Sequence, residues 1–144
     1  VPLLLHSERM FVVGRGTGLA IAMEAALKFK EVCGIQAEAF SGAELRHGPL
    51  ALIEPGYPVL VFAPRGPAHA GLLALADDLR ARGAVVLFAG EGAVDALPLV
   101  AAAAPELDPM CAIQSFYVLA EALACARGRD RDAPPHLSKI TRTR

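Results

Sequence analysis

Residues 9–32 read RMFVV-GRGTG-LAIAMEAALKFKEV, an apolar run, a glycine-rich turn and a stretch rich in alanine, leucine and lysine. The run Arg9–Val13 has the composition of a short buried strand, and Leu19–Val32 has that of a helix. A strand that enters a helix through a tight glycine turn is typical of a parallel α/β sheet. The rest of the chain repeats this alternation.

Further apolar runs predict the remaining strands, and two long alanine- and leucine-rich stretches predict helices. The strands are expected at Gln36–Phe40, Pro58–Ala63 and Ala84–Ala89, with a weaker candidate at Leu97–Ala101, and the helices at Pro67–Arg82 and Pro109–Arg127. We therefore expect an α/β fold, a flavodoxin-like three-layer α/β/α sandwich with a mainly parallel sheet of four to five strands. One domain spans residues 1–128, and residues 129–144 form an extended polar tail.

The composition excludes several classes of function. The 144 residues hold 14 basic and 15 acidic side chains, so no bulk positive charge is available for nucleic acid or for an anionic membrane surface. No uninterrupted apolar stretch reaches the length of a spanning helix. The three cysteines form no CxxC pair and are expected to be buried free thiols in a reducing cytoplasm.

The glycine turn Gly14-Arg15-Gly16-Thr17-Gly18 could present backbone N–H groups to an anion at the start of the helix. A dinucleotide-binding fingerprint requires glycine or alanine where this chain has Leu19, so the spacing fails by one position. A turn that packs helix against strand is the simpler interpretation, and no cofactor is predicted.

Glu24, Lys28 and Glu31 lie on one face of the first predicted helix, at spacings of four and three residues. Two interpretations remain open from the spacing. The three side chains could form a solvated, salt-bridged stripe, or they could line a pocket in which a carboxylate beside an ammonium group transfers protons.

Two further residues are candidates for chemistry. His47, before Gly48-Pro49, is expected in a loop, where a histidine can shuttle protons near neutral pH. Lys139 lies in the polar tail, where composition alone indicates an ordinary solvated charge. The four histidines show no metal-binding spacing, so no metal site is predicted.

Several segments together resemble the sugar-isomerase (SIS) domain family, and in particular the C-terminal SIS domain of amino-sugar-phosphate synthases that use glutamine and fructose 6-phosphate. The resemblance rests on Val13–Gly16, Ala22–Glu31, Ala37–Phe40, Gly42–Ile53 and the tail pattern Gly128-x-Asp130-x-Asp132-x-Pro134-x-x-Leu137-x-Lys139-x-Thr141. It covers nearly the whole chain.

The resemblance implies catalytic roles for three residues and substrate contacts for two. Glu31 matches the glutamate that moves a proton between C1 and C2 of the sugar, and His47 matches a ring-opening histidine that reaches into a neighbouring subunit's site. Lys139 matches a tail lysine that forms a Schiff base with the ketose carbonyl. Glu24 and Lys28 match residues that line the same pocket. The tail would close over the active site.

The implied activity interconverts fructose 6-phosphate and glucosamine 6-phosphate. The chain lacks the serine- and threonine-rich loop that grips the sugar phosphate in the family's first SIS domain, and it lacks a glutaminase domain. Arg46 replaces a lysine of the family, and Cys33–Gln36 also departs from the synthases. A SIS-type glucosamine-6-phosphate deaminase, a ketosamine-phosphate deglycase and a non-catalytic sugar-phosphate sensor are therefore alternatives.

The resemblance also implies partners. We expect a sugar-phosphate substrate, an upstream SIS domain that is missing from this chain, and a homodimer in which the apolar helices and His47 meet a partner. Neither nucleic acid nor a membrane is expected as a partner, and the expected location is cytoplasmic.

Overall fold

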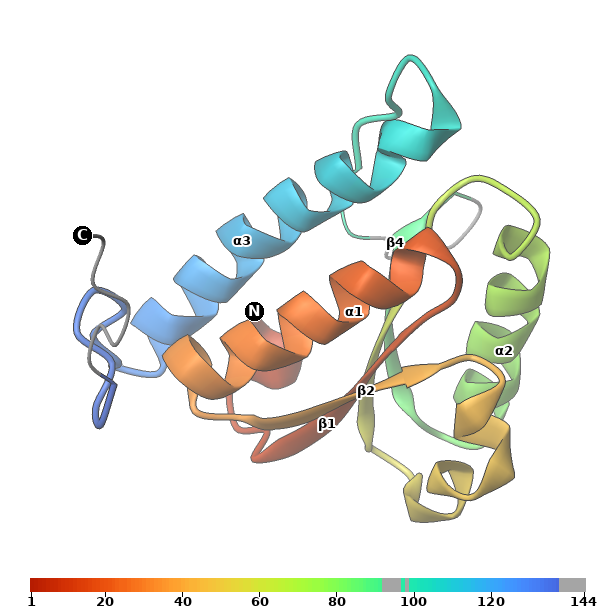
Figure 1. The fold of residues 1–144 in the computed structure, drawn as a ribbon. Helices are drawn as coiled ribbons and strands as arrows, with labels where there is room; N and C mark the ends of the chain where they lie inside the picture. The colour runs from red at the N-terminus through yellow and green to blue at the C-terminus, as the bar shows by residue number, and fades with distance from the viewer. Residues whose placement is uncertain (92–96, 98, 138–144) are drawn as a thin grey trace.

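The computed structural model describes residues 1–91, 97 and 99–137 of the chain, and its centre is a four-stranded parallel sheet (Figure 1). The strands are β1 (Arg9–Gly14), β2 (Gln36–Ser41), β3 (Pro58–Ala63) and β4 (Val85–Gly90). Their order is β2-β1-β3-β4, and every neighbouring pair is parallel. The predicted parallel α/β sheet is confirmed, and the strand order reverses direction between β1 and β3.

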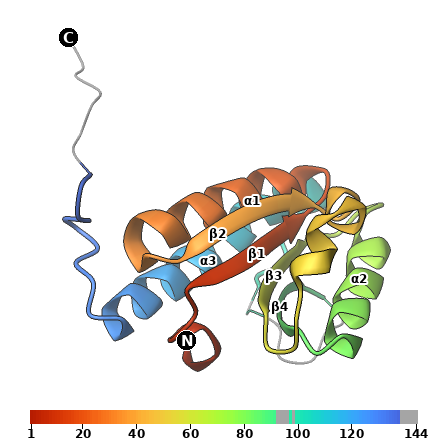
Figure 2. The same ribbon diagram turned by 90° about the horizontal axis from the view of Figure 1, so that it is seen from below.

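Three α-helices cover the two faces of this sheet. They are α1 (Thr17–Lys28), α2 (His69–Ala81) and α3 (Asp108–Ala126). Helices α1 and α3 lie side by side on one face, and α2 lies on the other (Figures 1 and 2). The three-layer sandwich expected from the sequence is therefore confirmed.

Each face of the sheet has its own hydrophobic core. Under α1 and α3, the Phe116 ring packs edge-on against Phe29 at 5.0 Å and against Phe62 at 6.1 Å between ring centroids. Under α2, Phe11 packs against Tyr57 at 4.9 Å. All six residues of β3 are buried, as its continuous apolar sequence predicts for a central strand.

The first helix ends differently from its prediction. It begins at Thr17, two residues early, and after Lys28 it continues as a single π-helical turn, η2 (Phe29–Cys33). Gly34 follows with φ 63°, and a Cβ there would lie 2.0 Å from the guanidinium carbon of Arg129. The left-handed backbone angle favours glycine at this position, and a larger residue would also require the Arg129 side chain to move.

The weak strand predicted over 97–101 is absent from the described residues. Leu97 donates one backbone hydrogen bond to Phe88 at 2.7 Å, and residues 99–101 form no strand. The sequence places a proline at 98, which has no N–H to donate to a ladder. Residues 92–96 and 98 lie outside the described part of the chain.

Two short 3-10 helices follow β2, and a reciprocal pair of hydrogen bonds of the capping-box type precedes the first. They are η3 (Glu44–His47) and η4 (Pro49–Leu52). The Ser41 amide donates to Glu44 Oε2 at 2.9 Å, and the Glu44 amide donates to Ser41 Oγ at 3.1 Å. His47, expected in a loop, is the last residue of η3 and is exposed.

One described helical stretch, Pro105–Ala126, has the length and apolar composition of a membrane span, and 28% of its most apolar window is buried. Its inner side, with Phe116, Ala120 and Leu123, belongs to the core that α1 shares. Its outer side holds exposed apolar residues.

Candidate functional site

The structure brings three of the predicted site residues together on α1 and its π-helical turn. Lys28 Nζ lies 3.9 Å from Glu24 Oε1 and 2.5 Å from Glu31 Oε2. Their side chains are between 27% and 36% exposed, so the cluster lies at the surface without being fully solvated. Glu31 belongs to η2, and π-helical turns inside helices are frequent at functional sites.

Tyr117 of α3 joins this cluster, although sequence reasoning did not identify it. Its hydroxyl donates to Glu24 Oε1 at 3.1 Å, across 93 positions of chain. Burial raises the pKa of Tyr117, and the hydrogen bond to Glu24 raises it further. The hydrogen bond to Glu31 raises the pKa of Lys28 despite partial burial. Lys28 therefore remains an ammonium ion suited to binding oxygen atoms, and it is no free amine for nucleophilic attack.

Arg127, at the end of α3, holds the π-helical turn against the start of the chain. Its Nε donates to the carbonyl of Cys33 at 2.8 Å, and one terminal nitrogen donates to the carbonyls of Leu5 at 2.7 Å and Ser7 at 3.0 Å. The last residues of η2 are therefore fixed by contacts to both ends of the domain. The arrangement sets where Glu31 lies.

His47 lies at the opposite edge of the sheet from this cluster. From Thr17 to Glu31 the helix advances roughly 20 Å away from the carboxyl ends of the strands, and β2 returns over a similar length to η3. Figure 2 shows the end of α1 and the segment after β2 on opposite sides of the domain. The chain by itself does not bring His47 to Glu31.

His47 lines a cavity of about 840 Å³ at the carboxyl ends of β1 and β2. Arg15, which follows β1, and Arg46 also line it, together with the start of α2 at Pro67 and Ala68. Ligands of open parallel sheets bind outside the carboxyl ends of the strands, near the point where the strand order reverses. The position of this cavity therefore matches the expected ligand edge.

The glycine turn after β1 has a packing role. A Cβ at Gly14 would lie 2.1 Å from the carbonyl oxygen of Gly18, so the strand and the first turn of α1 approach too closely for any side chain. The turn therefore has the role of packing the helix against the strand.

Arg65 and Asp108 join the loops at the carboxyl end of β3. Arg65 Nε donates to Asp108 Oδ2 at 2.7 Å, its terminal nitrogen donates to Asp108 Oδ1 at 2.6 Å, and the Ala102 amide donates to the same carboxylate at 3.1 Å. These bonds lower the pKa of Asp108 to about 2, and the side-chain hydrogen bond from Arg65 has the largest effect. The pair fixes the start of α3 relative to β3, and sequence reasoning missed it.

Lys139 lies outside the described residues, and so does the end of the tail. The described part of the tail leaves the end of α3 beside the π-helical turn, since the Arg129 guanidinium lies against Gly34 (Figure 2). Gly34 follows Glu31 by three residues, so the tail begins close to the Glu31 segment.

The expectation of three buried thiols is correct for one cysteine only. Cys33 is buried, Cys111 is half-buried and Cys125 is exposed, and all three are free. Burial raises the pKa of Cys33 to about 11, which leaves its thiol protonated and unreactive. Within the described ranges, no group of three or more histidine, cysteine or acidic residues is placed to hold a metal ion.

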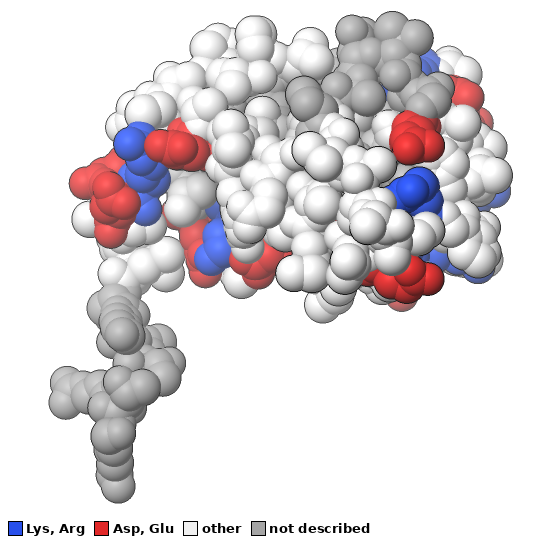
Figure 3. Space-filling model, turned by 90° about the horizontal axis from the view of Figure 1, so that it is seen from above, with Lys and Arg blue, Asp and Glu red and all other residues white. Residues whose placement is uncertain are grey.

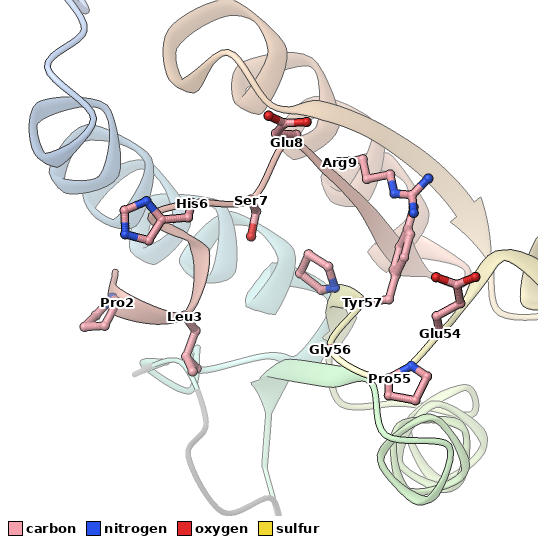
Figure 4. A pocket seen from close by; sticks show the side chains of 11 residues that line it. Pro2, Leu3, His6, Ser7, Glu8, Arg9, Glu54, Pro55, Gly56 and Tyr57 are labelled. Atoms are coloured by element: carbon pink, nitrogen blue, oxygen red, sulfur yellow. The ribbon is translucent and has the colours of Figure 1, made fainter.

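A second cavity, of about 660 Å³, opens at the amino ends of the strands (Figure 4). It lies between residues 2–9 and the turn 54–58, and the Arg9 guanidinium lies 5.5 Å from the centre of the Tyr57 ring. None of the predicted site residues lines it.

The parallel sheet, its order and the cavity at the carboxyl ends define a doubly wound α/β domain of the ligand-binding type. The family model of the SIS domain matches residues 3–91, more than half of the chain, and the chain belongs to the SIS domain family.

Among curated relatives, the glutamine–fructose-6-phosphate aminotransferase (isomerizing) of Leifsonia xyli subsp. xyli is 41% identical over 144 residues. The alignment covers 92% of this chain and 23% of that enzyme. The chain thus spans about a quarter of the length of the curated relatives that it matches.

Two solved structures show the same fold with detectable sequence identity. The C-terminal domain of glucosamine-fructose-6-phosphate aminotransferase from Francisella tularensis has a TM-score of 0.80 at 27% identity, over 90% of this chain and 38% of that one. Glucosamine-6-phosphate deaminase from Thermotoga maritima has a TM-score of 0.77 at 29% identity, over 96% of this chain and 41% of that one. The chain therefore resembles both a synthase domain and a deaminase.

Proposed function

We propose that this chain is the phosphosugar-binding SIS domain of an enzyme that interconverts fructose 6-phosphate and glucosamine 6-phosphate. The observation that carries the proposal is the cluster of Glu24, Lys28 and Glu31 beside the departing tail. The names of the relatives support it, since they include an isomerizing aminotransferase and a glucosamine-6-phosphate deaminase.

The chemistry uses the residue types of the cluster and the tail. The neutral Lys139 amine adds to the C2 carbonyl of the open-chain ketose, water leaves, and a C=N bond forms that acidifies the C1 protons. Ammonia displaces the lysine from that imine. Glu31 takes a proton from C1 and delivers it to C2, and the proton of the C1 hydroxyl passes to the C2 nitrogen, so the ketose imine becomes the 2-amino aldose. The reverse sequence releases ammonia.

Lys28 and Glu24 have binding roles in this scheme. The hydrogen bond to Glu31 holds Lys28 as an ammonium ion, which can donate to a sugar oxygen. Glu24 fixes Lys28 from its other side and is itself fixed by the Tyr117 hydroxyl. The tail, residues 129–144, closes over the bound sugar and excludes water.

His47 serves a neighbouring copy of the chain. Glu31 lies roughly 20 Å along α1 from the carboxyl ends of the strands, where His47 lies, so one substrate does not reach both residues of a single subunit. We infer a homodimer in which the His47 of each subunit opens the sugar ring in the site of the other.

A second SIS domain covers the outer surface of α1 and α3. Figure 3 shows a broad surface with few charges between charged groups at its two ends. The apolar side chains exposed on these helices are Met23, Leu27, Met110, Tyr117 and Val118. The relatives' additional length accommodates a domain that would bury them and supply the phosphate-gripping loop that this chain lacks.

The deaminase direction is the second candidate, because the Thermotoga maritima deaminase matches 96% of this chain. Either direction uses metabolites of the cytoplasm, where free thiols persist, and we propose that location.

Ammonia release from glucosamine 6-phosphate, and its reverse with fructose 6-phosphate, tests the proposal. The assay uses this chain alone and joined to a family first SIS domain. Turnover that Glu31→Gln abolishes and Glu121→Gln preserves supports the enzyme, and the favoured direction separates deaminase from synthase. Sugar-phosphate binding without turnover in both preparations would reject it in favour of a sensor.

A further inference from the structure

Buried contacts hold helix α3 beside α1 and the π-helical turn (Figure 1). Phe116 of α3 is completely buried, and its ring packs edge-on against Phe29, the first residue of η2, at 5.0 Å between ring centroids. One helical turn further along α3, the carbonyl of Ala120 accepts a hydrogen bond from the Cys33 thiol at 3.4 Å. The core therefore fixes the position of α3 relative to α1, whatever polar side chains lie at the surface.

Tyr117 directly follows the anchored Phe116, and its hydroxyl group lies at the polar cluster on α1. Tyr117 is 39% exposed, and its ring centroid lies 5.9 Å from that of Phe116. The hydroxyl donates to Glu24 Oε1 at 3.1 Å. In the described part of the chain, this is the only side-chain hydrogen bond or ion pair that joins the cluster to an element outside α1 and η2.

The oxygen atom that accepts the Tyr117 hydrogen bond is also the one that faces Lys28. Glu24 Oε1 lies 3.9 Å from Lys28 Nζ, and Lys28 donates to Glu31 Oε2. Hydroxyl, carboxylate, ammonium and carboxylate groups therefore follow one another in a chain of four. The Glu24 side chain is 36% exposed, so without the hydroxyl it would sample several rotamers, and Lys28 would lose a fixed neighbour.

We propose that Tyr117 is a positioning residue, whose hydroxyl holds Glu24 and thereby keeps the Lys28 ammonium group in place beside Glu31. The inference rests on the proposed function, because the cluster that Tyr117 supports is the proposed site. Tyr117 acts through Glu24, so the role requires no contact between the tyrosine and the sugar. It makes α3 a part of the site, although the candidate residues on the first helix all come from α1 and η2.

The variant Tyr117→Phe tests the proposal in an enzyme formed by this chain and a first SIS domain. It removes one oxygen atom and keeps the ring beside Phe116, so the apolar surface of α3 is retained. We expect kcat/KM for glucosamine 6-phosphate to fall about tenfold, because a hydrogen bond to a charged group is lost. Tyr57→Phe is the matched control and should keep the original kcat/KM, since Tyr57 packs on the opposite face of the sheet.

A double-mutant cycle with Glu24→Ala separates positioning from a general effect on stability. If Tyr117 acts through Glu24, the double variant Tyr117→Phe/Glu24→Ala has the same kcat/KM as Glu24→Ala alone. Thermal unfolding verifies that the variants are folded at the assay temperature. An unchanged kcat/KM in Tyr117→Phe would overturn the proposal, and so would losses that multiply in the double variant.

A second measurement does not depend on turnover. The chain has two tyrosines, so NMR of the ring carbon that bears the hydroxyl, with Tyr57→Phe for assignment, reports the pKa of Tyr117 in the 144-residue chain. Burial raises the pKa of Tyr117, Glu24 raises it further, and Lys28 lowers it. Glu24→Gln should therefore lower the pKa of Tyr117, whereas Glu38→Gln should lower only that of Tyr57.

The two measurements distinguish failure of this inference from failure of the proposed function. Turnover in the original enzyme without a change in the pKa of Tyr117 in Glu24→Gln would reject the role of Tyr117 and leave the proposed function standing. An original enzyme without turnover, in a chain that shows the pKa change, would reject the proposed function and with it the reaction that Tyr117 serves.

Discussion

Lys28 Nζ donates to Glu31 Oε2 at 2.5 Å, across the junction where α1 becomes a π-helical turn. The bond keeps a lysine charged and holds a carboxylate at a fixed position on a rigid helix. A fully solvated pair would move freely, whereas this pair holds the Glu31 carboxylate in place, as the proposed proton transfer requires.

Replacement of the Glu31 carboxylate is expected to lower turnover without lowering the thermal stability of the chain. Glu31→Gln is expected to lower the turnover of glucosamine 6-phosphate at least about a hundredfold, because the amide accepts no proton. The thermal midpoint should change little, since a partly exposed ion pair contributes about 0–1 kcal/mol. Steady-state kinetics and thermal unfolding measure the two effects. Glu121→Gln, on the surface of α3, is the control, and a loss of turnover in both variants would contradict the assignment.

The Arg65–Asp108 pair predicts an acid-sensitive step in stability. The pKa of Asp108 is about 2 in the folded chain, below its ordinary value, so the carboxylate stabilises the fold above about pH 4. That contribution is lost as pH falls toward 2. We expect it to amount to about 1 to 2 kcal/mol of the free energy of unfolding, a value reduced for solvent screening because the Arg65 side chain is a third exposed.

Urea unfolding at pH 5 and pH 2.5 measures this contribution. Asp108→Asn should lower the free energy of unfolding at pH 5 and flatten its dependence on pH. Asp77→Asn, which removes an exposed pair with Arg80, should keep the dependence of the original chain. The same pH slope in Asp108→Asn as in the original chain would refute the prediction.

Arg127 is expected to be the most important surface arginine for stability. Arg127→Ala leaves the carbonyls of Leu5, Ser7 and Cys33 without a charged donor, which predicts a loss of about 2–3 kcal/mol in the free energy of unfolding. Arg127→Lys should recover part of it. Arg131→Ala removes an exposed ion pair with Glu121 and an exposed hydrogen bond to Cys125, and it should change the free energy of unfolding less than Arg127→Ala does. Equal losses in the two alanine variants would show that the carbonyl contacts contribute little.

The outer surface of α1 and α3 is expected to govern assembly. Val118→Lys places a charge on a side chain that is 69% exposed, so the isolated chain should remain folded. Association with a second SIS domain should weaken by at least about tenfold, because an apolar contact becomes a buried charge. Analytical ultracentrifugation measures the association. Val100→Lys, at an equally exposed valine outside these helices, is the control, and identical behaviour of the two variants would place the interface elsewhere.

The sequence determined much of the fold because strand and helix patterns are local. The runs of β3 and β4 and the capping box of Ser41 and Glu44 were all readable within a few residues. The contact of Tyr117 with Glu24 and that of Arg65 with Asp108 join positions 93 and 43 residues apart, so no spacing could reveal them. The hydrogen bond from Arg127 to the end of the π-helical turn also joins positions that are distant in sequence.

The candidate site could be predicted from the sequence only in part. The cluster on α1 follows from helical spacing and is confirmed as a spatial group, although its catalytic role stays a prediction. The separation of His47 from Glu31 depends on the path of β2 across the sheet, which the residue types do not encode. The cavity that Arg15 and Arg46 line required the fold to bring two loops together.

Borohydride trapping with fructose 6-phosphate tests the central claim most directly. The chain has three lysines, Lys28, Lys30 and Lys139, so peptide mapping of the reduced adduct identifies the amine. We predict an adduct on Lys139, absent from Lys139→Arg and retained in Lys30→Arg, in this chain or when it is joined to a first SIS domain. No adduct on Lys139 in either preparation would contradict the Schiff-base account.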